Sequence, residues 1–317
     1  MLTGDLSKQR AGNDSTLFDD NVIDAIKRLQ ERHGLNSTGK LDPSTLQAMN
    51  VPVETRMAQI ALNMERIRWL PEDMGKRYIA VNVPEFKLRV MEKEKPELDM
   101  RVIVGEYYHF TPVFSDTLEH IVFSPEWTVP RTIAAKEMLP LLQQNPTYLV
   151  SNNYEVYPSW NKRDTIPLDT DSVDWQVLTA DTMQHYRIVQ KSGPNNSLGR
   201  VKFMLPNKMD IYLHDTPATH LFSRSERAFS HGCIRVEKPA ELAEYLLQHK
   251  ARWDKTAIEE AMHAEEPETV SLPDKLPVYI LYQTVWVDEQ GRLNFREDIY
   301  GHDQKQLSAL KRKSAQL

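Results

Sequence analysis

The sequence is poor in several features, and each shortage excludes a class of protein. Its 317 residues include one cysteine, Cys233, so no internal disulfide can form and the thiol serves either packing or chemistry. Its 11 glycines and 19 prolines form no repeat, which excludes collagen-like chains. No apolar run approaches the roughly 20 residues of a transmembrane helix. Acidic residues outnumber basic ones, 45 to 39, which argues against nucleic-acid binding.

The remaining composition is that of an ordinary globular protein. Hydrophobic residues make up 40% and charged residues 26% of the chain, and the length predicts roughly two domains. The first residues lack the basic and then apolar pattern of a secretory leader. We therefore expect either a cytosolic protein or a form trimmed of its leader.

Residues 1–70 are predicted to form three short helices in a small bundle. Apolar residues recur at helical spacing, a glycine follows the first helix where a C-cap is favoured, and an Asp-Pro pair begins the second. The residues are Val22, Ile26, Leu29 and Gly34 for the first helix, Asp42, Pro43, Leu46 and Met49 for the second, and Met57, Ile60, Met64 and Ile67 for the third.

Residues 76–253 are predicted to form a β-rich domain, which makes the chain α+β, because apolar and polar residues alternate from Tyr78 on. The charged stretch 92–97 is expected to be a hairpin tip. Residues 124–196 are rich in Trp, Tyr, Asn and Pro and poor in strand signal, and we expect a lid or binding loop there. Strands are expected at 79–83, 86–90, 100–104, 120–123, 201–205 and 210–214, and helices at 134–144 and 240–249.

Residues 254–317 are expected to be a C-terminal extension with a β-hairpin. Two strand-like runs, 278–287 and 292–299, flank Asp-Glu-Gln-Gly at 288–291, a sequence that suits a hairpin turn. A short helix with a basic end follows from Gln304, and a frayed terminus is favoured over a binding site.

The lone thiol lies in a stretch that favours chemistry over inert packing. A thiol becomes a strong nucleophile when a nearby imidazole takes its proton. His231 lies two residues before Cys233 and His214 nineteen before it. His214 ends a predicted strand, and a return loop could bring it opposite the sulfur. We expect His214 to be the base, with His231 as the alternative.

The residues around Cys233 suit acyl transfer. Gly232 permits a tight turn, which would leave the N–H groups of Gly232 and Cys233 facing an oxyanion, each worth ~3 kcal/mol. Ser230 could orient His231 or the backbone, and Arg235 offers a cation for a substrate carboxylate. A metal site is disfavoured because no metal-ligand spacing is present. Residues 193–199 lack a nucleotide-binding glycine pattern, so no cofactor is expected.

These motifs resemble those of a known family. Ser-His-Gly-Cys-Ile-Arg-Val at 230–236, with His214 upstream, is similar to the signature of the L,D-transpeptidases, the YkuD-domain family of bacterial cell-wall enzymes. The segments 111–112, 123–130 and 193–203 resemble the YcbB-type subgroup, and residues 25–46 resemble three-helix peptidoglycan-binding domains. The resemblance implies a mostly-β catalytic domain with a capping subdomain inserted at about 124–196, plus a small N-terminal three-helix domain.

The resemblance also implies a two-step reaction. Cys233 would attack the carbonyl between the third residue of a stem tetrapeptide, usually meso-diaminopimelate, and D-Ala, while His214 accepts the thiol proton. The side-chain amine of a second stem would resolve the thioester and form a 3→3 cross-link. The Asp215 carbonyl would orient His214. Tyr212 and Trp127 are candidates for the cleft wall, with core packing equally open.

The resemblance further implies partners and a location. Peptidoglycan stem peptides would be substrates and carbapenem β-lactams inhibitors, in cell-wall biogenesis and the maintenance of cell shape. The location would be the periplasm or cell envelope, and the absence of a leader suggests a trimmed form. Three alternatives remain open: L,D-carboxypeptidase hydrolysis, attachment of a protein to the wall, and a non-catalytic wall-binding module.

Overall fold

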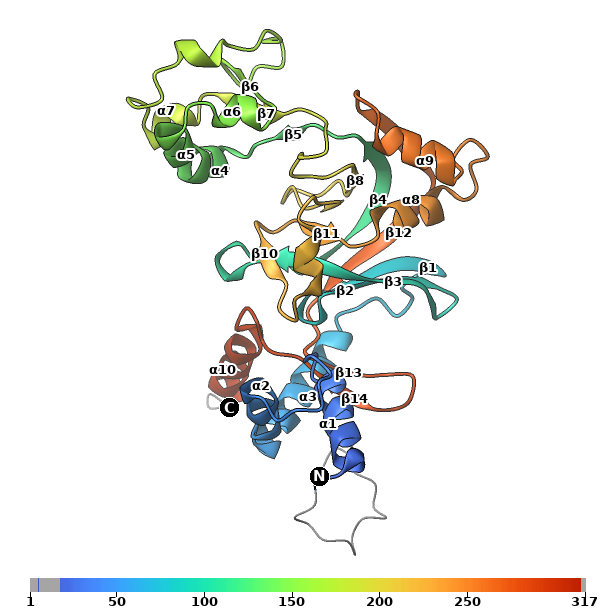
Figure 1. Cartoon of the computed structure of the whole chain (residues 1–317). Helices are drawn as coiled ribbons and strands as arrows, with labels where there is room; N and C mark the ends of the chain where they lie inside the picture. Colours follow the sequence, from blue (N-terminus) through green and yellow to red (C-terminus); the bar gives the residue numbers. More distant parts are fainter. Residues whose placement is uncertain (1–4, 6–17, 315–317) are drawn as a thin grey trace, which may run out of the picture. The chain divides into compact units, whose positions relative to one another are not determined.

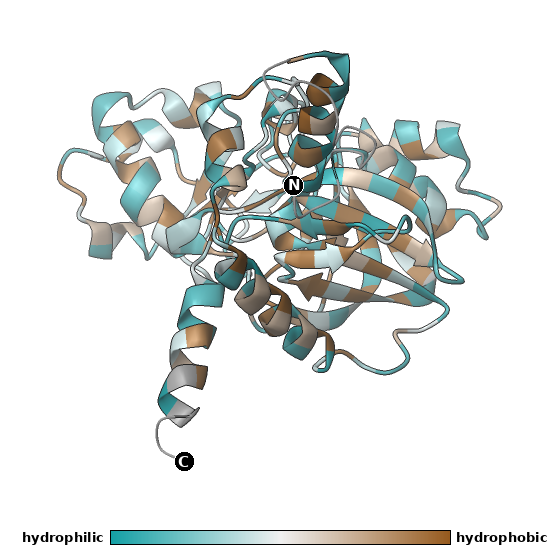
Figure 2. Ribbon diagram, turned by 90° about the horizontal axis from the view of Figure 1, so that it is seen from below, coloured by the Kyte–Doolittle hydropathy of each residue, from teal (hydrophilic) through white to brown (hydrophobic). Residues whose placement is uncertain are grey.

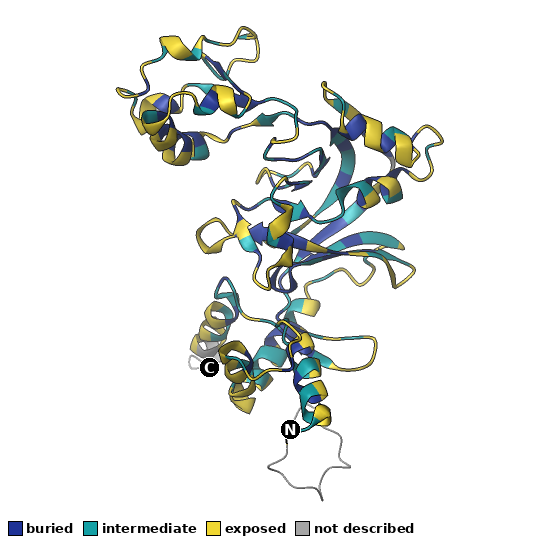
Figure 3. Ribbon diagram, viewed as in Figure 1, coloured by how far each residue is buried: buried dark blue, intermediate teal, exposed yellow. Residues whose placement is uncertain are grey.

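The computed structural model describes residue 5 and residues 18–314, and these form two compact units that are described separately (Figure 1). Figure 2 shows hydrophobic stretches along the strands, and Figure 3 shows that strand residues are mostly buried or half-buried. Unit 1 comprises Met1–Ser115, Leu221–Gly232 and Pro277–Leu317, and unit 2 comprises Asp116–His220 and Cys233–Leu276.

The three helices predicted near the start of the chain are present in unit 1. They are α1 (Asp20–Arg32), α2 (Pro43–Met49) and α3 (Val53–Ile67). The Asp42 carboxylate accepts the Thr45 N–H at 2.8 Å and caps α2, as its position before a proline predicts. Gly34 follows α1 with φ +69°, the left-handed conformation that ends helices.

The strands of unit 1 pair one after another, in the order β10 (Ala228–Ser230), β3 (Lys95–Gly105), β2 (Lys87–Glu92), β1 (Arg77–Asn82) and β12 (Glu268–Leu281). β2 pairs antiparallel with β1 and β3, and β10 pairs parallel with β3. The end of β12 pairs parallel with β1.

The hairpin tip expected at 92–97 is shorter in the structure, because Glu92 and Lys95 are already paired in the strands. Only Lys93 and Glu94 form the turn, with φ +50° and +66°, which is the two-residue geometry that matches strand twist. Pro96 lies inside β3, next to a register shift at Met91, where a missing N–H is tolerated.

The main strands of unit 2 run in the order β11-β9-β8-β4-β12. They are β4 (Phe114–Phe123), β8 (Val201–Met204), β9 (Leu213–His214) and β11 (Ile234–Val236), with the first part of β12. Neighbours are antiparallel from β4 to β9, whereas β9 and β11 are parallel. Helices α8 (Pro239–Leu247) and α9 (Lys255–Met262) pack against each other.

The predicted strand at 210–214 is shorter than expected. The side-chain oxygen Oδ1 of Asn207 accepts the N–H groups of Met209 and Ile211 at 3.0 and 3.1 Å, and Asp210 has φ +54°. These contacts hold the approach to β9 as a loop, because side-chain hydrogen bonds of Asn compete with strand pairing.

The inserted segment 124–196 contains more strand than expected. A three-stranded antiparallel sheet of β5 (Trp127–Thr128), β7 (Arg187–Gln190) and β6 (Tyr154–Tyr157) backs a separate core that includes Leu142, Leu149 and Ile188. Strands of two to four residues are too short to give a recognisable period of two. The helices here are α4 (Arg131–Ile133), a π-helical turn (Ala134–Met138), α5 (Leu139–Gln144), α6 (Tyr148–Ser151) and α7 (Ala180–Met183).

The C-terminal hairpin is present, although the predicted strand 278–287 is split. β12 ends at Leu281, and β13 (Val285–Val287) pairs with β14 (Leu293–Phe295) in a sheet of their own. The Gly291 N–H donates to the Asp288 carbonyl at 2.9 Å to close the turn. Helix α10 (His302–Ser314) follows. Within the described residues, no helix combines the length and apolarity that crossing a membrane needs.

Candidate active site

Unit 2 brings four of the predicted site residues to one face of its sheet. β9 and β11 pair so that His214 lies beside Arg235, and the Ile234 N–H donates to the Tyr212 carbonyl at 3.1 Å. Residues two apart on a strand share a face, and parallel strands in register carry paired side chains to the same side. His214, Arg235, Tyr212 and Cys233 therefore gather on one face.

Lys202 joins this group, although no sequence motif pointed to it. It pairs with His214 across β8 and β9, so that Lys202, His214 and Arg235 form a row over three strands. Its ammonium lies 5.9 Å from the centre of the Tyr212 ring, and burial lowers the pKa of Lys202. The signal in the sequence is the alternation around it, where buried Val201 and Phe203 flank a lysine on the opposite face.

His214 is held as a neutral imidazole. The side chain is 4% exposed, and Nδ1 lies 2.6 Å from the Asp215 carbonyl oxygen. A carbonyl only accepts, so Nδ1 carries the proton and Nε2 is the basic nitrogen. Burial and the charges of Arg235 and Lys202 lower the pKa of His214 to about 3, while hydrogen bonds to the backbone of Asp215 and Leu198 act in the opposite direction.

The Cys233 thiol is also neutral at rest. Burial raises its pKa, and hydrogen bonds from the backbone and side chain of Tyr212 partly offset this. The Sγ atom lies 3.5 Å from the Asp210 carbonyl oxygen, which accepts its proton. The pKa shifts of Cys233 and His214 thus favour a neutral pair over a preformed thiolate–imidazolium pair.

The turn before Cys233 belongs to unit 1 and differs from expectation in one contact. Gly232 is buried with φ +110°, a conformation that favours glycine. However, its N–H donates to the buried Ser230 hydroxyl at 3.2 Å. The expectation that this N–H faces an oxyanion is therefore wrong for this geometry, because Ser230 already accepts from it.

His231 points to a different neighbour. Its side chain is exposed, and its ring centre lies 4.9 Å from that of His109. The His109 Nδ1 atom in turn lies 2.8 Å from the Glu106 carboxylate. His231 is therefore part of a surface pair, whereas His214 is buried beside Arg235.

Comparison with known proteins assigns the family. The model of the L,D-transpeptidase catalytic domain, YkuD, matches residues 76–280, which is more than half of the chain. The chain belongs to the L,D-transpeptidase family. A second model, described as "Putative peptidoglycan binding domain", matches residues 5–49.

Individual L,D-transpeptidases are similar to this chain to different degrees. A Haemophilus influenzae protein named "Putative L,D-transpeptidase" is 34% identical over 247 residues, covering 78% of this chain and 48% of that protein. The chain thus spans about half the length of this curated relative. A solved L,D-transpeptidase from Mycobacterium smegmatis is 13% identical with a TM-score of 0.31, and the match covers 65% of this chain and 58% of that one. One from Stackebrandtia nassauensis is 14% identical with a TM-score of 0.30, and the match covers 88% of both chains.

Asp215 has a structural role in this L,D-transpeptidase-family chain besides its carbonyl contact. Its Oδ2 atom accepts the Arg200 N–H at 2.8 Å. Gly199 has φ +62°, and a Cβ there would lie 2.3 Å from Asp215 Oδ2. The carboxylate therefore holds the 199–200 turn, and the backbone carbonyl of the same residue faces His214.

Arg235 and Trp127 have different surroundings. Arg235 is half-buried, and its buried Nε atom has no hydrogen-bond partner among the described residues. An unsatisfied buried N–H of this kind is available to an anionic ligand. Trp127 instead packs against the core of the inserted segment, with its ring centre 6.5 Å from that of Tyr154. Of the two readings of Trp127, the structure favours core packing over the cleft wall.

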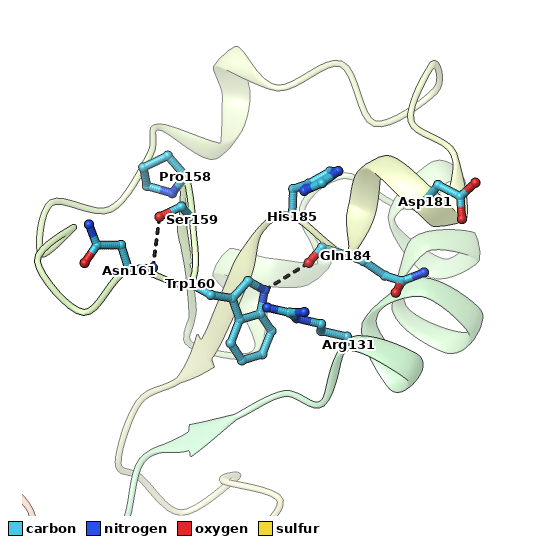
Figure 4. A pocket seen from close by; sticks show the side chains of 8 residues that line it. All are labelled: Arg131, Pro158, Ser159, Trp160, Asn161, Asp181, Gln184 and His185. Carbon is cyan, nitrogen blue, oxygen red and sulfur yellow. Dashed lines mark hydrogen bonds between the residues drawn. The ribbon is translucent and has the colours of Figure 1, made fainter.

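The inserted segment also carries a recess of about 550 Å³ (Figure 4). The Arg131 guanidinium lies 4.5 Å from the centre of the Trp160 ring, and the Trp160 indole N–H donates to the Gln184 carbonyl at 2.9 Å. None of the site residues predicted from the sequence lines this recess.

Proposed function

We propose that this chain is a peptidoglycan L,D-transpeptidase that forms 3→3 cross-links through a Cys233 thioester. The donor is a stem tetrapeptide, and the acceptor is the side-chain amine of meso-diaminopimelate on a second stem. The observation that carries this proposal is the shared face of β9 and β11. His214, whose Nδ1 proton is donated to the Asp215 carbonyl, lies on the same face as Cys233 and opposite Arg235. Family membership supports the reaction class.

Acylation follows from a neutral thiol and a neutral imidazole. The sulfur attacks the carbonyl carbon between meso-diaminopimelate and D-Ala, and the thiol proton passes to His214 Nε2 as the C–S bond forms. The resulting oxyanion is stabilised by the Cys233 N–H. The C–N bond then breaks, His214 returns the proton to the leaving D-Ala amine, and a thioester remains.

Substrate charge strengthens the base in this mechanism. Arg235 and Lys202 both lower the pKa of His214. A stem carboxylate bound between these cations offsets their charge, so that the pKa of His214 rises when the donor binds. The acceptor amine then attacks the thioester carbon, His214 Nε2 takes a proton from the amine, and the C–S bond breaks as that proton returns to the Cys233 sulfur. The inserted segment covers the donor and limits hydrolysis.

Intact mass spectrometry after exposure to a carbapenem tests the proposal. We expect a single covalent adduct on the wild-type chain and none on Cys233→Ser. A folded protein whose Cys233 reacts with iodoacetamide but not with the carbapenem would contradict the enzymatic function and favour a non-catalytic wall-binding module.

Muropeptide analysis with purified tetrapeptide donors separates transfer from hydrolysis. We expect 3→3 dimers and released D-Ala. Tripeptides without dimers would indicate an L,D-carboxypeptidase instead, and a product linked to a protein amine would indicate attachment to the wall.

We place the protein in the periplasm or cell envelope, where its substrate lies.

A further inference from the structure

We propose that Thr111 and Tyr300 are positioning residues for the nucleophile, acting through the peptide bond between Gly232 and Cys233. This inference rests on the proposed function. Tyr300 lies outside the residues 76–280 that match the catalytic-domain model, so the family signature does not point to it.

Thr111 binds the carbonyl of the residue before the nucleophile. The side chain is 0% exposed, and its hydroxyl lies 2.8 Å from the Gly232 carbonyl oxygen and 2.9 Å from the Gly105 nitrogen. Because the Gly105 N–H can only donate, the single hydroxyl proton of Thr111 goes to the Gly232 oxygen. The direction of this hydrogen bond is therefore determined by the structure.

Tyr300 holds the backbone of Thr111 through a hydrogen bond. Its hydroxyl is 3.3 Å from the Thr111 nitrogen and 2.5 Å from the Gly105 carbonyl oxygen. It accepts from the first group and donates to the second, so Gly105, Thr111 and Tyr300 form a closed and fully satisfied network. Tyr300 itself is 2% exposed and stacks on Tyr282 with ring centres 5.6 Å apart.

The backbone of Gly105 makes this arrangement possible. A Cβ at Gly105 would lie 2.0 Å from the His109 carbonyl oxygen, so only glycine allows the loop 106–111 to fold back over it. The Glu106 N–H also donates to the Ser230 carbonyl at 2.9 Å. The loop thus holds the nucleophile turn at both Ser230 and Gly232.

The consequence for catalysis follows from peptide geometry. The peptide group is planar and trans, so the Gly232 carbonyl and the Cys233 N–H point in opposite directions. Fixing the carbonyl with the Thr111 hydroxyl fixes the direction of the N–H that we assign to the oxyanion. A hydrogen bond to the carbonyl also polarises the peptide and strengthens the N–H as a donor.

The experiment compares two reactions of the same sulfur in the full chain. Acylation by imipenem passes through an oxyanion, whereas alkylation by iodoacetamide does not. For Thr111→Val we expect acylation to slow by about 10- to 100-fold, with alkylation and its pH midpoint unchanged within about twofold. Tyr300→Phe should slow acylation less, and Thr111→Ser, which keeps the hydroxyl, should restore it.

Two matched controls measure loss of a buried hydroxyl elsewhere in unit 1. Tyr279 donates to the Met74 carbonyl at 3.2 Å, and Thr45 to Asp42 at 2.7 Å. Tyr279→Phe and Thr45→Val should acylate at the wild-type rate.

Wild-type acylation rates in a folded Thr111→Val variant would overturn the inference, as would an equal loss of acylation and alkylation. If Thr111→Val does not fold, Tyr300→Phe, which keeps the ring packing, decides in the same way. A wild-type chain that is alkylated but never acylated would overturn the proposed function and this inference with it.

Discussion

His214 shows how burial and neighbouring charges together set the protonation state of a single residue. Its position at the end of a strand made it the expected base, but only the structure shows it buried between Lys202 and Arg235. Burial is the largest cause of the lowered pKa, and the two cations disfavour protonation of the imidazole further. The His214 imidazole is thus neutral in the absence of substrate, and binding of an anionic substrate would raise its pKa.

We expect His214→Ala to abolish turnover and His231→Ala to reduce it by less than about tenfold. Loss of a positioned general base typically costs about 10²- to 10⁴-fold, whereas the exposed His231 ring lies against His109. Steady-state formation of 3→3 dimers checks the ranking. The reverse order of the two variants would reassign the base.

The pKa of His214 also predicts how stability changes with pH. An unfolded histidine titrates near 6.5, and the folded value is about 3, so the unfolded chain binds more protons between these values. Stability is then lost as pH falls from about 6.5 to about 3. We expect His214→Gln to flatten this dependence in urea unfolding curves.

His33 and His185 serve as controls for this measurement. Burial, as the largest cause, lowers the pKa of His33 to about 4, so His33→Gln should also flatten the curve. His185 is exposed and reports the effect of losing a surface histidine. Parallel curves for wild type and His214→Gln would contradict the assignment.

At the scale of elements, the alignment of three strands determines the site. β8, β9 and β11 bring together residues separated by up to 33 positions, from Lys202 to Arg235. A shift of one residue in either pairing would move one of these side chains to the opposite face. The register, rather than any motif, makes Lys202 part of the site.

We expect Lys202→Met to raise the KM for a tetrapeptide donor by about tenfold, because in the proposed mechanism Lys202 is one of the two cations that bind a stem carboxylate. Removing the charge should also raise the pKa of His214, which NMR titration of the imidazole can measure. Lys208→Met, on the exposed loop after β8, is the control. Unchanged KM and pKa would place Lys202 outside the site.

Element boundaries differed from expectation where side chains compete with strand pairing. The strand β9 begins later than expected because the Asn207 side chain accepts hydrogen bonds from the backbone N–H groups of Met209 and Ile211. The short strands of the inserted segment gave no readable period, yet they form a sheet with its own core. By contrast, helix caps such as Asp42 act within a few residues and were predicted correctly.

At the scale of the molecule, the N-terminal helices are tied to the C-terminal segment of unit 1. The Asn63 amide donates to the Thr284 hydroxyl at 2.8 Å, and the Arg32 guanidinium donates to the Leu293 carbonyl at 2.7 Å. Helix α3 packs through Leu62 and Asn63, while Met57 and Met64 are 64% and 63% exposed. Its regular apolar spacing therefore does not mark the buried face.

The exposed stripe on α3, formed by Met57 and Met64, can be tested for wall binding in the full chain. Residues 5–49 match a peptidoglycan-binding model, and the neighbouring stripe on α3 is an apolar surface. We expect the double variant Met57→Lys, Met64→Lys to keep its melting temperature within about 3 °C, since surface changes alter stability little. Its cosedimentation with insoluble sacculi should fall several-fold. Unchanged cosedimentation would place wall binding elsewhere.

The sequence by itself determined what depends on nearby residues. Helix caps, the hairpin turn at 288–291 and the left-handed backbone at Gly232 need only local chemistry. The Ser-His-Gly-Cys stretch predicts a reactive thiol. The tertiary structure decided everything that depends on distant partners. The neutral state of His214, the place of Lys202 beside it, and the network in which Tyr300 holds Thr111 against the Gly232 carbonyl all require register and burial. The reason is that charge and hydrogen-bond energies depend on distance and on exclusion of water.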